Sequence, residues 1–285
     1  MMIPAEWGDW APAQARDWIA VPGAHDDKYS RGVLGLLTGS ADYPGAAVLG
    51  VEAALHSGVG MVRYLGPQRA ADFVLARRPE TVTAIGRVQA WLLGSGMDAA
   101  ARDAPTSASL ASALAEGLPT VIDAGALDLI GAATGPVVIT PHARELAGVL
   151  GRVGITVSAE QIAEAPGEWA VRAAESLAVT VLLKGSVTHV ASPLGVRLTV
   201  ARATPWLATA GTGDVLGGVL GALVATHSDR IRADAGALAS LAATASLIHG
   251  LAAHRVSAGG PFTALDLAGT VSQVVRDLAT GNPEL

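Results

Sequence analysis

The sequence predicts a layered α/β fold in which helices cover a mostly parallel central sheet. Short apolar segments typical of buried strands alternate with helical segments along most of the chain, and an antiparallel hairpin is indicated only late, over residues 187–200. The chain has 285 residues, of which 51% are hydrophobic, which suits one large domain with a sizeable core. We therefore expect a single domain over residues 1–285, with a loop-rich lead-in over residues 1–27.

The first half of the chain supplies most of the expected parallel strands. Residues 32–39 are apolar and bounded by glycines, which predicts a buried strand. Residues 46–57 place apolar side chains on one helical face, and Gly58 ends that helix. Further strands are predicted at residues 61–65, 90–93, 120–123 and 137–140.

The second half adds the hairpin and the closing helices. Ser158 and Gln161 form a capping box, and the helical pattern that follows to about residue 177 is broken at Pro166. A strand over residues 181–183 ends at Lys184, and the segments 187–191 and 196–200 flank a turn sequence, Ser-Pro-Leu-Gly. Three helices are predicted near residues 214–226, 233–255 and 263–279.

The composition excludes several classes of chemistry and partner. The chain has no cysteine, so disulfides, thiolate nucleophiles and Cys-ligated metal centres are excluded. Its net charge is -6 and its basic residues are scattered, which argues against a nucleic-acid surface. Residues 1–20 lack a signal-peptide pattern, and the apolar runs are too short to span a membrane. We expect a cytoplasmic protein with no membrane or nucleic-acid partner.

The most informative segment is residues 208–218, A-T-A-G-T-G-D-V-L-G-G. Glycines here allow the backbone amides of Gly211, Thr212 and Gly213 to converge at the start of a helix, where they bind phosphate. Asp214 would lie in the first helical turn and is placed to take a proton from a hydroxyl that attacks the phosphate. A plain glycine-rich turn, with Asp214 favoured only by the helix dipole, explains the segment equally well at this point.

Other polar residues follow the predicted strands. Lys184 is placed to reach a nucleotide phosphate, although a strand-end lysine extending to water is the commoner case. His142 follows a strand and faces a ligand in one interpretation, or simply accompanies a proline-initiated helix in the other. The histidines at 56, 249 and 254 lie within helical patterns and are interpreted as structural.

These positions converge on one site. In open parallel sheets, ligands bind beyond the carboxyl ends of the strands. The polar or small residues at those ends are Gly39, Ser40, Gly94, Ser95, Gly96, Asp123, His142, Lys184 and Asp214.

Taken in order, these segments resemble the NAD(P)H-hydrate dehydratase family, within the ribokinase-like superfamily. The resemblance runs from about residue 28 to 278. The early G-A-A-V-L helix at 45–49 and the T-P-H-x-x-E motif at 140–145 are the most specific matches, and related kinases share the L-K-G and G-T-G-D motifs. The remaining matches lie at residues 28–32, 39–40, 57–60, 93–96 and 121–126.

The chain departs from the family pattern at several positions. Thr204, Pro205 and Trp206 stand where the family usually has Asn-Pro-Gly, and Gly125 replaces the second aspartate of a D-A-D-A motif. Residues 26–32 replace the family's H-K-G entry with D-D-K-Y-S-R-G. The epimerase domain fused to many bacterial members is expected to be absent from this chain.

The resemblance implies a repair reaction. Family members dehydrate the S form of NADH-hydrate or NADPH-hydrate by phosphorylating its ring hydroxyl, with ADP in typical bacterial members or with ATP, and magnesium shares the phosphate charge. By resemblance, Asp214 is the base, and the amides of Gly211, Thr212 and Gly213 hold the developing charge. The nucleotide would be lined by Lys184, Gly185, Ser186, Val187, Thr188 and Gly213, and the hydrate by Ala46, Gly96, His142 and Asp214.

The metal ligands are not identified by the resemblance. A homo-oligomer is expected, with the Ala- and Leu-rich C-terminal region as a source of interface. Two alternatives stay open from the sequence: a small-molecule kinase of the same fold, of the hydroxyethylthiazole or hydroxymethylpyrimidine kinase type, and a non-catalytic nucleotide-binding regulator.

Overall fold

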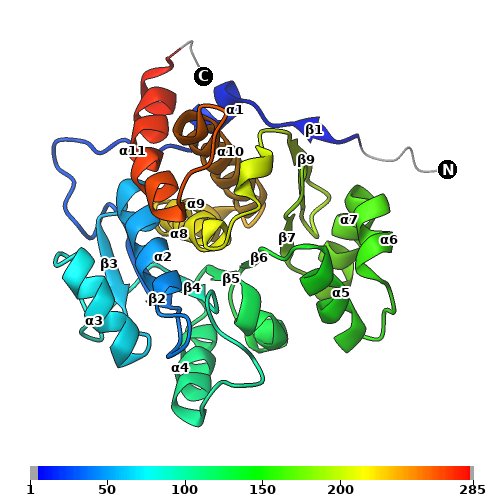
Figure 1. Cartoon of the computed structure of the whole chain (residues 1–285), viewed down its shortest axis with the longest axis horizontal. Helices are drawn as coiled ribbons and strands as arrows, with labels where there is room; N and C mark the ends of the chain where they lie inside the picture. The colour runs from blue at the N-terminus through cyan, green and yellow to red at the C-terminus, as the bar shows by residue number, and fades with distance from the viewer. Residues whose placement is uncertain (1–5, 283–285) are drawn as a thin grey trace.

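Nine strands form one sheet in the computed structural model, which describes residues 6–282 (Figure 1). The strand order is β1-β9-β8-β7-β6-β5-β4-β2-β3. Within the described residues only β8 runs against the other strands, so the predicted mostly parallel sheet with a late hairpin is confirmed. The strands are β1 (Gly8–Asp9), β2 (Val33–Leu37), β3 (Met61–Tyr64), β4 (Ala90–Leu93), β5 (Thr120–Ile122), β6 (Val137–Ile139), β7 (Thr180–Leu183), β8 (Thr188–Ala191) and β9 (Arg197–Val200).

Helices cover both faces of this sheet. Figure 1 shows α10 and α11 on one side of the sheet and α4 and α5 on the other. The helices are α1 (Pro12–Arg16), α2 (Gly45–His56), α3 (Gln68–Arg77), α4 (Ala104–Ala115), α5 (Ala143–Arg152), α6 (Ala159–Glu164), α7 (Pro166–Leu177), α8 (Thr212–Thr226), α9 (Ser228–Ala233), α10 (Ala237–Ser257) and α11 (Ala264–Thr280). Two 3-10 segments, η1 (Ala124–Ala132) and η2 (Pro205–Leu207), lie in connections.

The central strands are buried on both faces, and this creates two apolar cores. Along β2, Leu34 and Leu36 point into a core shared with α2, α8, α10 and α11, whereas Val33 and Leu37 point into a core shared with α4 to α7. Successive side chains of a strand point to opposite faces, so a continuous apolar run is what a doubly covered parallel strand requires. The layered α/β/α arrangement predicted from the sequence follows.

Most predicted elements lie within a few residues of their expected bounds. The expected helix over 233–255 is α10, which begins later, at Ala237, because Asp234 Oδ1 accepts a hydrogen bond from the Gly236 amide in the turn before it. The short helix α9 that precedes this turn was not predicted. The helices α3 and α4 and the segment η1 were not predicted.

The lead-in is more ordered than expected. It contains β1, which pairs with the edge strand β9, and α1. The Trp10 indole N–H donates to Thr244 Oγ1 at 3.1 Å, and Trp18 is buried, so these residues attach the segment to α10 and its neighbours. Residues 1–5, which belong to the expected lead-in and to the stretch without a signal pattern, lie outside the described residues, as do 283–285.

The helix α10 is long and apolar enough to cross a membrane by length and composition alone. However, 83% of its most apolar window is buried inside the protein. It is therefore a core helix, and its apolar side chains are used within the chain.

A close helix crossing places the start of α8 over the sheet. A Cβ added at Gly218 would collide with the Gly50 carbonyl oxygen of α2, so only glycine permits this approach. The contact fixes α8 against α2 and brings Asp214 to the carboxyl edge of the strands.

Candidate active site

The turn before α8 presents free amide groups at the helix start. Gly211 has φ of 92°, in the left-handed region that favours glycine, and the Thr212 hydroxyl donates to the carbonyls of Leu207 at 2.8 Å and Thr209 at 2.9 Å. The Thr212 amide donates to the Thr209 carbonyl at 3.4 Å, whereas the amides of Gly211, Gly213 and Asp214 have no acceptor among residues 6–282. Free amides at a helix start bind anions.

Four neighbouring strands end in one hydrogen-bonded cluster around Asp123. This side chain follows β5 and is 4% exposed. Its Oδ1 accepts from Thr140 Oγ1 at 2.7 Å and from Lys184 Nζ at 3.2 Å, and its Oδ2 accepts from Ser95 Oγ at 3.0 Å. Since β4, β5, β6 and β7 are adjacent and parallel, the residues that follow them meet at one edge.

Lys184 links this cluster to the start of α8. Its backbone amide donates to the Pro141 carbonyl at 2.9 Å, which holds the residue at the end of β7. Its Nζ lies 3.7 Å from Glu145 Oε2 and would lie 3.8 Å from a Cβ added at Gly213. The ammonium therefore faces the first turn of α8.

Burial and charge shift the pKa values of two groups here. Burial raises the pKa of Asp214 to about 7, the Asp123 carboxylate adds to the rise, and Lys184 opposes it. Burial lowers the pKa of Lys184, but the nearby carboxylates outweigh it, so the pKa lies above the usual lysine value. A carboxylate that titrates near neutral pH beside a fixed cation is suited to proton transfer.

His142 caps the helix that carries Glu145. Its Nδ1 accepts from the Glu145 amide at 3.2 Å, and Glu145 Oε2 accepts from the His142 amide at 2.8 Å. The sequence offered two interpretations here, an ordinary first-turn Glu145 and a His142 that faces a ligand. The two are compatible, because the His142 ring is half exposed and lines two cavities while it caps the helix. This geometry assigns the ring proton of a neutral His142 to Nε2.

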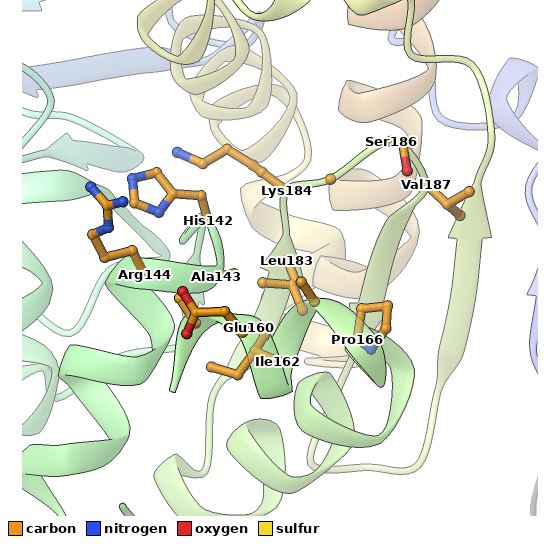
Figure 2. Close-up of a pocket in the computed structure, with 13 residues that line it drawn as sticks. His142, Ala143, Arg144, Glu160, Ile162, Pro166, Leu183, Lys184, Ser186 and Val187 are labelled. Carbon is orange, nitrogen blue, oxygen red and sulfur yellow. The ribbon is translucent and has the colours of Figure 1, made fainter. Parts of the chain in front are cut away.

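The largest of the cavities described here, about 690 Å³, lies between the β7–β8 turn, the residues before α8, and α10. Five of the six residues expected at a nucleotide line it: Lys184, Gly185, Ser186, Thr188 and Gly213. The sixth, Val187, lines a second cavity of about 610 Å³ between the same turn and helices α5 to α7. Figure 2 shows this second cavity, where the Lys184 side chain extends away from Ser186 and Val187.

A third cavity, about 500 Å³, is lined by Gly96, which is one of the four residues expected at the hydrate; Ala46, His142 and Asp214 do not line it. Its lining includes Tyr43, Gly96, Gly125 and Glu145. Ala46 packs directly against Gly96, since a Cβ added at Gly96 would collide with the Ala46 methyl. The structure thus brings Ala46 and Gly96 together, whereas His142 lines the other two cavities.

The sequence analysis gave little weight to two residues that lie at the candidate site. Asp123 was noted only as a polar strand end, and its contacts depend on the order of four strands. His249 was interpreted as structural, but it lines the 690 Å³ cavity and its Nε2 lies 2.9 Å from the Thr212 carbonyl oxygen. Burial lowers the pKa of His249 to about 4, so the ring is neutral and donates to that carbonyl.

The described residues contain no group of three or more His, Asp or Glu side chains placed to hold a metal ion. The oxygens of Asp123 are already engaged by two hydroxyls and an ammonium. The chain therefore does not fit a magnesium site made of protein ligands alone.

Solved structures share the fold of this chain. A Bacillus subtilis structure described as ADP/ATP-dependent NAD(P)H-hydrate dehydratase co-crystallized with ATP/Mg2+ superposes with a TM-score of 0.83, at 23% identity, covering 96% of this chain and 99% of that one. A ribokinase-like superfamily protein from Enterococcus faecalis V583 gives a TM-score of 0.81 at 21% identity, with 96% of each chain covered. At these identities the likeness shows the fold, which is ribokinase-like.

Sequence comparison identifies the family. The model of the NAD(P)H-hydrate dehydratase (Carb_kinase) family matches residues 34–270, and the chain belongs to this family. It is 32% identical over 263 residues to the ADP-dependent (S)-NAD(P)H-hydrate dehydratase of Neisseria meningitidis serogroup B, covering 86% of this chain and 84% of that protein.

A longer relative matches only in part. The bifunctional NAD(P)H-hydrate repair enzyme Nnr of Mycobacterium leprae is 43% identical over 231 residues, which are 74% of this chain and 45% of that protein. This chain thus spans less than half the length of that relative.

Proposed function

We propose that the chain dehydrates the S form of NADH-hydrate or NADPH-hydrate, using ADP in preference to ATP. Family membership supports the reaction, and relatives named as ADP-dependent support the choice of nucleotide. One observation carries the proposal: the Asp214 carboxylate and the free backbone amides lie together in the first turn of α8, and this turn faces the Lys184 ammonium.

Asp214 acts as the general base in this proposal. It takes the proton of the ring hydroxyl as the hydroxyl oxygen attacks the terminal phosphorus of the nucleotide. The bond from that phosphorus to the bridging oxygen breaks, and AMP leaves when ADP is the donor. The free amides near Gly211 and Gly213 hold charge on the phosphate oxygens.

The phosphate ester then supplies the leaving group that hydroxide cannot. The ring carbon–oxygen bond breaks with its electron pair on phosphate, while the lone pair of the ring nitrogen stabilises the carbon. Loss of a proton from the adjacent carbon restores the dihydropyridine ring, so one nucleotide is spent for each water removed.

The cavities suggest where each substrate binds. The 690 Å³ cavity would hold the nucleotide against Lys184, Gly185, Ser186, Thr188 and Gly213, with Val187 behind the same turn. The cavity beside Gly96 and Ala46 would hold the hydrate, whose reacting ring would have to extend beyond this cavity to reach His142 and Asp214, since neither residue lines it. Both cavities meet at Lys184. Its side chain lines the nucleotide cavity, and Glu145, which contacts its ammonium, lines the hydrate cavity.

Magnesium enters this proposal with the nucleotide. Mg²⁺ often binds through substrate phosphates and water with few protein ligands, which suits a site whose described carboxylates are not placed to hold a metal ion together. It supplies charge neutralisation to the phosphate, and the residue roles above do not depend on its position.

Three further proposals concern the whole chain. The single sheet supports one domain over residues 1–285, and the burial of α10 supports a soluble, cytoplasmic protein. We also propose a homo-oligomer. Because α10 is used in the core, other surfaces, such as the outer face of α11, would form the interface.

Incubation with chemically prepared NADH-hydrate tests the function. Restored NADH absorbance is expected with ADP, less with ATP, and none without nucleotide, with one phosphate released per turnover. Phosphorylation of a thiazole or pyrimidine alcohol, with the hydrate left unchanged, would establish the kinase alternative instead.

A further inference from the structure

Asp123 lies behind the reacting groups and is held rigidly. It is almost fully buried, and hydroxyls from the ends of β4 and β6 fix both of its oxygens. Ser95 and Thr140 orient the carboxylate but do not neutralise it. Its one ionic partner in the described chain is Lys184.

Lys184 lies within reach of several carboxylates but pairs with only some of them. Its Nζ is 3.2 Å from Asp123 and 3.7 Å from Glu145. Asp214 influences the same ammonium electrostatically, yet no ion pair within 4.0 Å joins the two among residues 6–282. A lysine side chain is flexible, so an anchor decides which carboxylate it neutralises.

We propose that Asp123 is a positioning residue that holds the Lys184 ammonium away from Asp214 and so preserves Asp214 as a base. This inference rests on the proposed function for its catalytic meaning, but the charge geometry can be tested without substrate. Without the Asp123 charge, Lys184 is expected to move to Asp214 and pair with it. The pair would make Asp214 easier to ionise but a weaker base.

The groups around Asp214 make the direction of the effect clear. Asp123 and Lys184 face it from the strand ends, and Glu145 reaches it only through Lys184. On α10 the His249 ring is neutral, and on α2 the Glu52 carboxylate is paired with Arg78. Both the loss of the Asp123 charge and the approach of Lys184 move the ionisation of Asp214 to lower pH.

The chain offers an unusually clean probe, because its only lysines are Lys28 and Lys184. Selective ¹⁵N labelling of lysine Nζ gives two NMR signals, which Lys28→Arg assigns. Lys28 is exposed, immediately after the lead-in, and serves as an internal reference. In the wild-type protein, the Lys184 signal should show an inflection near pH 7 as Asp214 ionises.

In Asp123→Asn we expect the Lys184 inflection at lower pH and with larger amplitude, because the ammonium has moved to Asp214. The plateau of kcat for the hydrate should fall on the order of tenfold, as expected for a weakened base. Asp123→Ser keeps a hydroxyl for Ser95 and Thr140 and carries the same expectation if the Asn variant does not fold.

Asp128→Asn is the matched control. Asp128 also lies after β5, is mostly buried, and pairs with Arg102 at 2.6 Å, but it has no contact with Lys184. It should lose thermal stability while leaving the Lys184 inflection in place.

Three results would overturn the positioning role. They are a wild-type Lys184 signal without an inflection near pH 7, an Asp123→Asn inflection at the wild-type pH, and a shifted inflection with unchanged amplitude. Failure of the wild-type protein to consume hydrate would instead refute the proposed function and leave the NMR result to decide the role of Asp123.

Discussion

Two clusters built around a buried carboxylate, Glu52 in one and Asp123 in the other, differ in their balance of charge. On α2, the Glu52 side chain is 1% exposed and is surrounded by Arg77 at 3.2 Å, Arg78 and His56. At the strand ends, the carboxylates of Asp123, Glu145 and Asp214 surround the single ammonium of Lys184. The cluster at Glu52 has an excess of cationic partners, whereas the cluster at the strand ends has an excess of carboxylates.

The balance determines what each carboxylate can do. Burial raises the pKa of Glu52, but its hydrogen bonds to Arg78 and Arg77 outweigh this, so the pKa lies below its usual value. Glu52 is therefore a fixed anion at neutral pH. Asp214 shares its cation with two other carboxylates and titrates near pH 7, which allows it to exchange a proton. An excess of cations keeps Glu52 ionised and holds α2 against Arg77 and Arg78, an arrangement that we call the Glu52 clamp. An excess of carboxylates leaves Asp214 able to take up and release a proton near neutral pH.

The largest effect is expected from Asp214→Asn. The change keeps the size of the side chain and removes the base, so turnover should fall on the order of 10²–10⁴-fold. Nucleotide affinity should persist because backbone amides remain. Because the pKa rises from 3.8 to about 7 on folding, Asp214 costs stability progressively as pH rises between these values, and the full cost remains above pH 7. At pH 8 the variant should therefore match or exceed the wild-type melting temperature.

Kinetics, calorimetric nucleotide binding and thermal melts on that one variant check this prediction. Turnover close to that of the wild-type protein would reduce Asp214 to a residue that only stabilises the helix start. It would also remove the distinction between the two clusters.

A smaller effect is expected from pH. As Asp214 takes up a proton, kcat/KM should fall about tenfold for each pH unit below about 7. The stabilisation from Glu52 should not change in this window. Because its pKa is lowered in the folded state, its contribution is full above the ordinary value of 4.5 and is lost only as pH falls through the lower folded value.

Rate profiles and urea unfolding of the wild-type protein and a Glu52→Gln variant, over about pH 5.5 to 8.5, separate the two behaviours. A rate that stays level through pH 7 would contradict the assignment of Asp214. A Glu52 contribution that changes between pH 6 and 8 would contradict the clamp.

The sequence predicted the positions of the candidate site residues better than their partners. Apolar runs ended by polar residues located Lys184, His142 and Asp214 at one edge, because parallel strands share a direction. The bond from Lys184 to Asp123 joins residues 61 positions apart and exists only because β5, β6 and β7 are neighbours. Strand order is a property of packing that a single sequence does not display.

The elements that were not predicted have weak local signals. The strand β1 is only two residues long and depends on the edge of β9 for its hydrogen bonds. The helix α4 is rich in Ala and Ser, so its apolar face has little contrast with its exposed face. The position of His249 at a cavity could not be predicted for a related reason. Its helix α10 is apolar on all sides, so the local sequence does not indicate which side opens onto a cavity.

The smallest effect on activity is expected from Glu52→Gln, although its effect on stability should be clear. The change keeps shape but leaves Arg77 and Arg78 facing a neutral group, and should lower the free energy of unfolding by about 1–3 kcal/mol, since both arginines are partly exposed. Turnover should stay within about twofold of wild type, because the α2 start beside Gly96 is held by packing rather than by this pair.

The matched control is Glu80→Gln, which removes a half-exposed partner 3.8 Å from the same Arg78 and should cost less than about 1 kcal/mol. Urea unfolding and hydrate turnover on both variants decide the matter. A loss of turnover in Glu52→Gln larger than its loss of stability explains would mean that the clamp also sets the site, and that the two clusters are not independent.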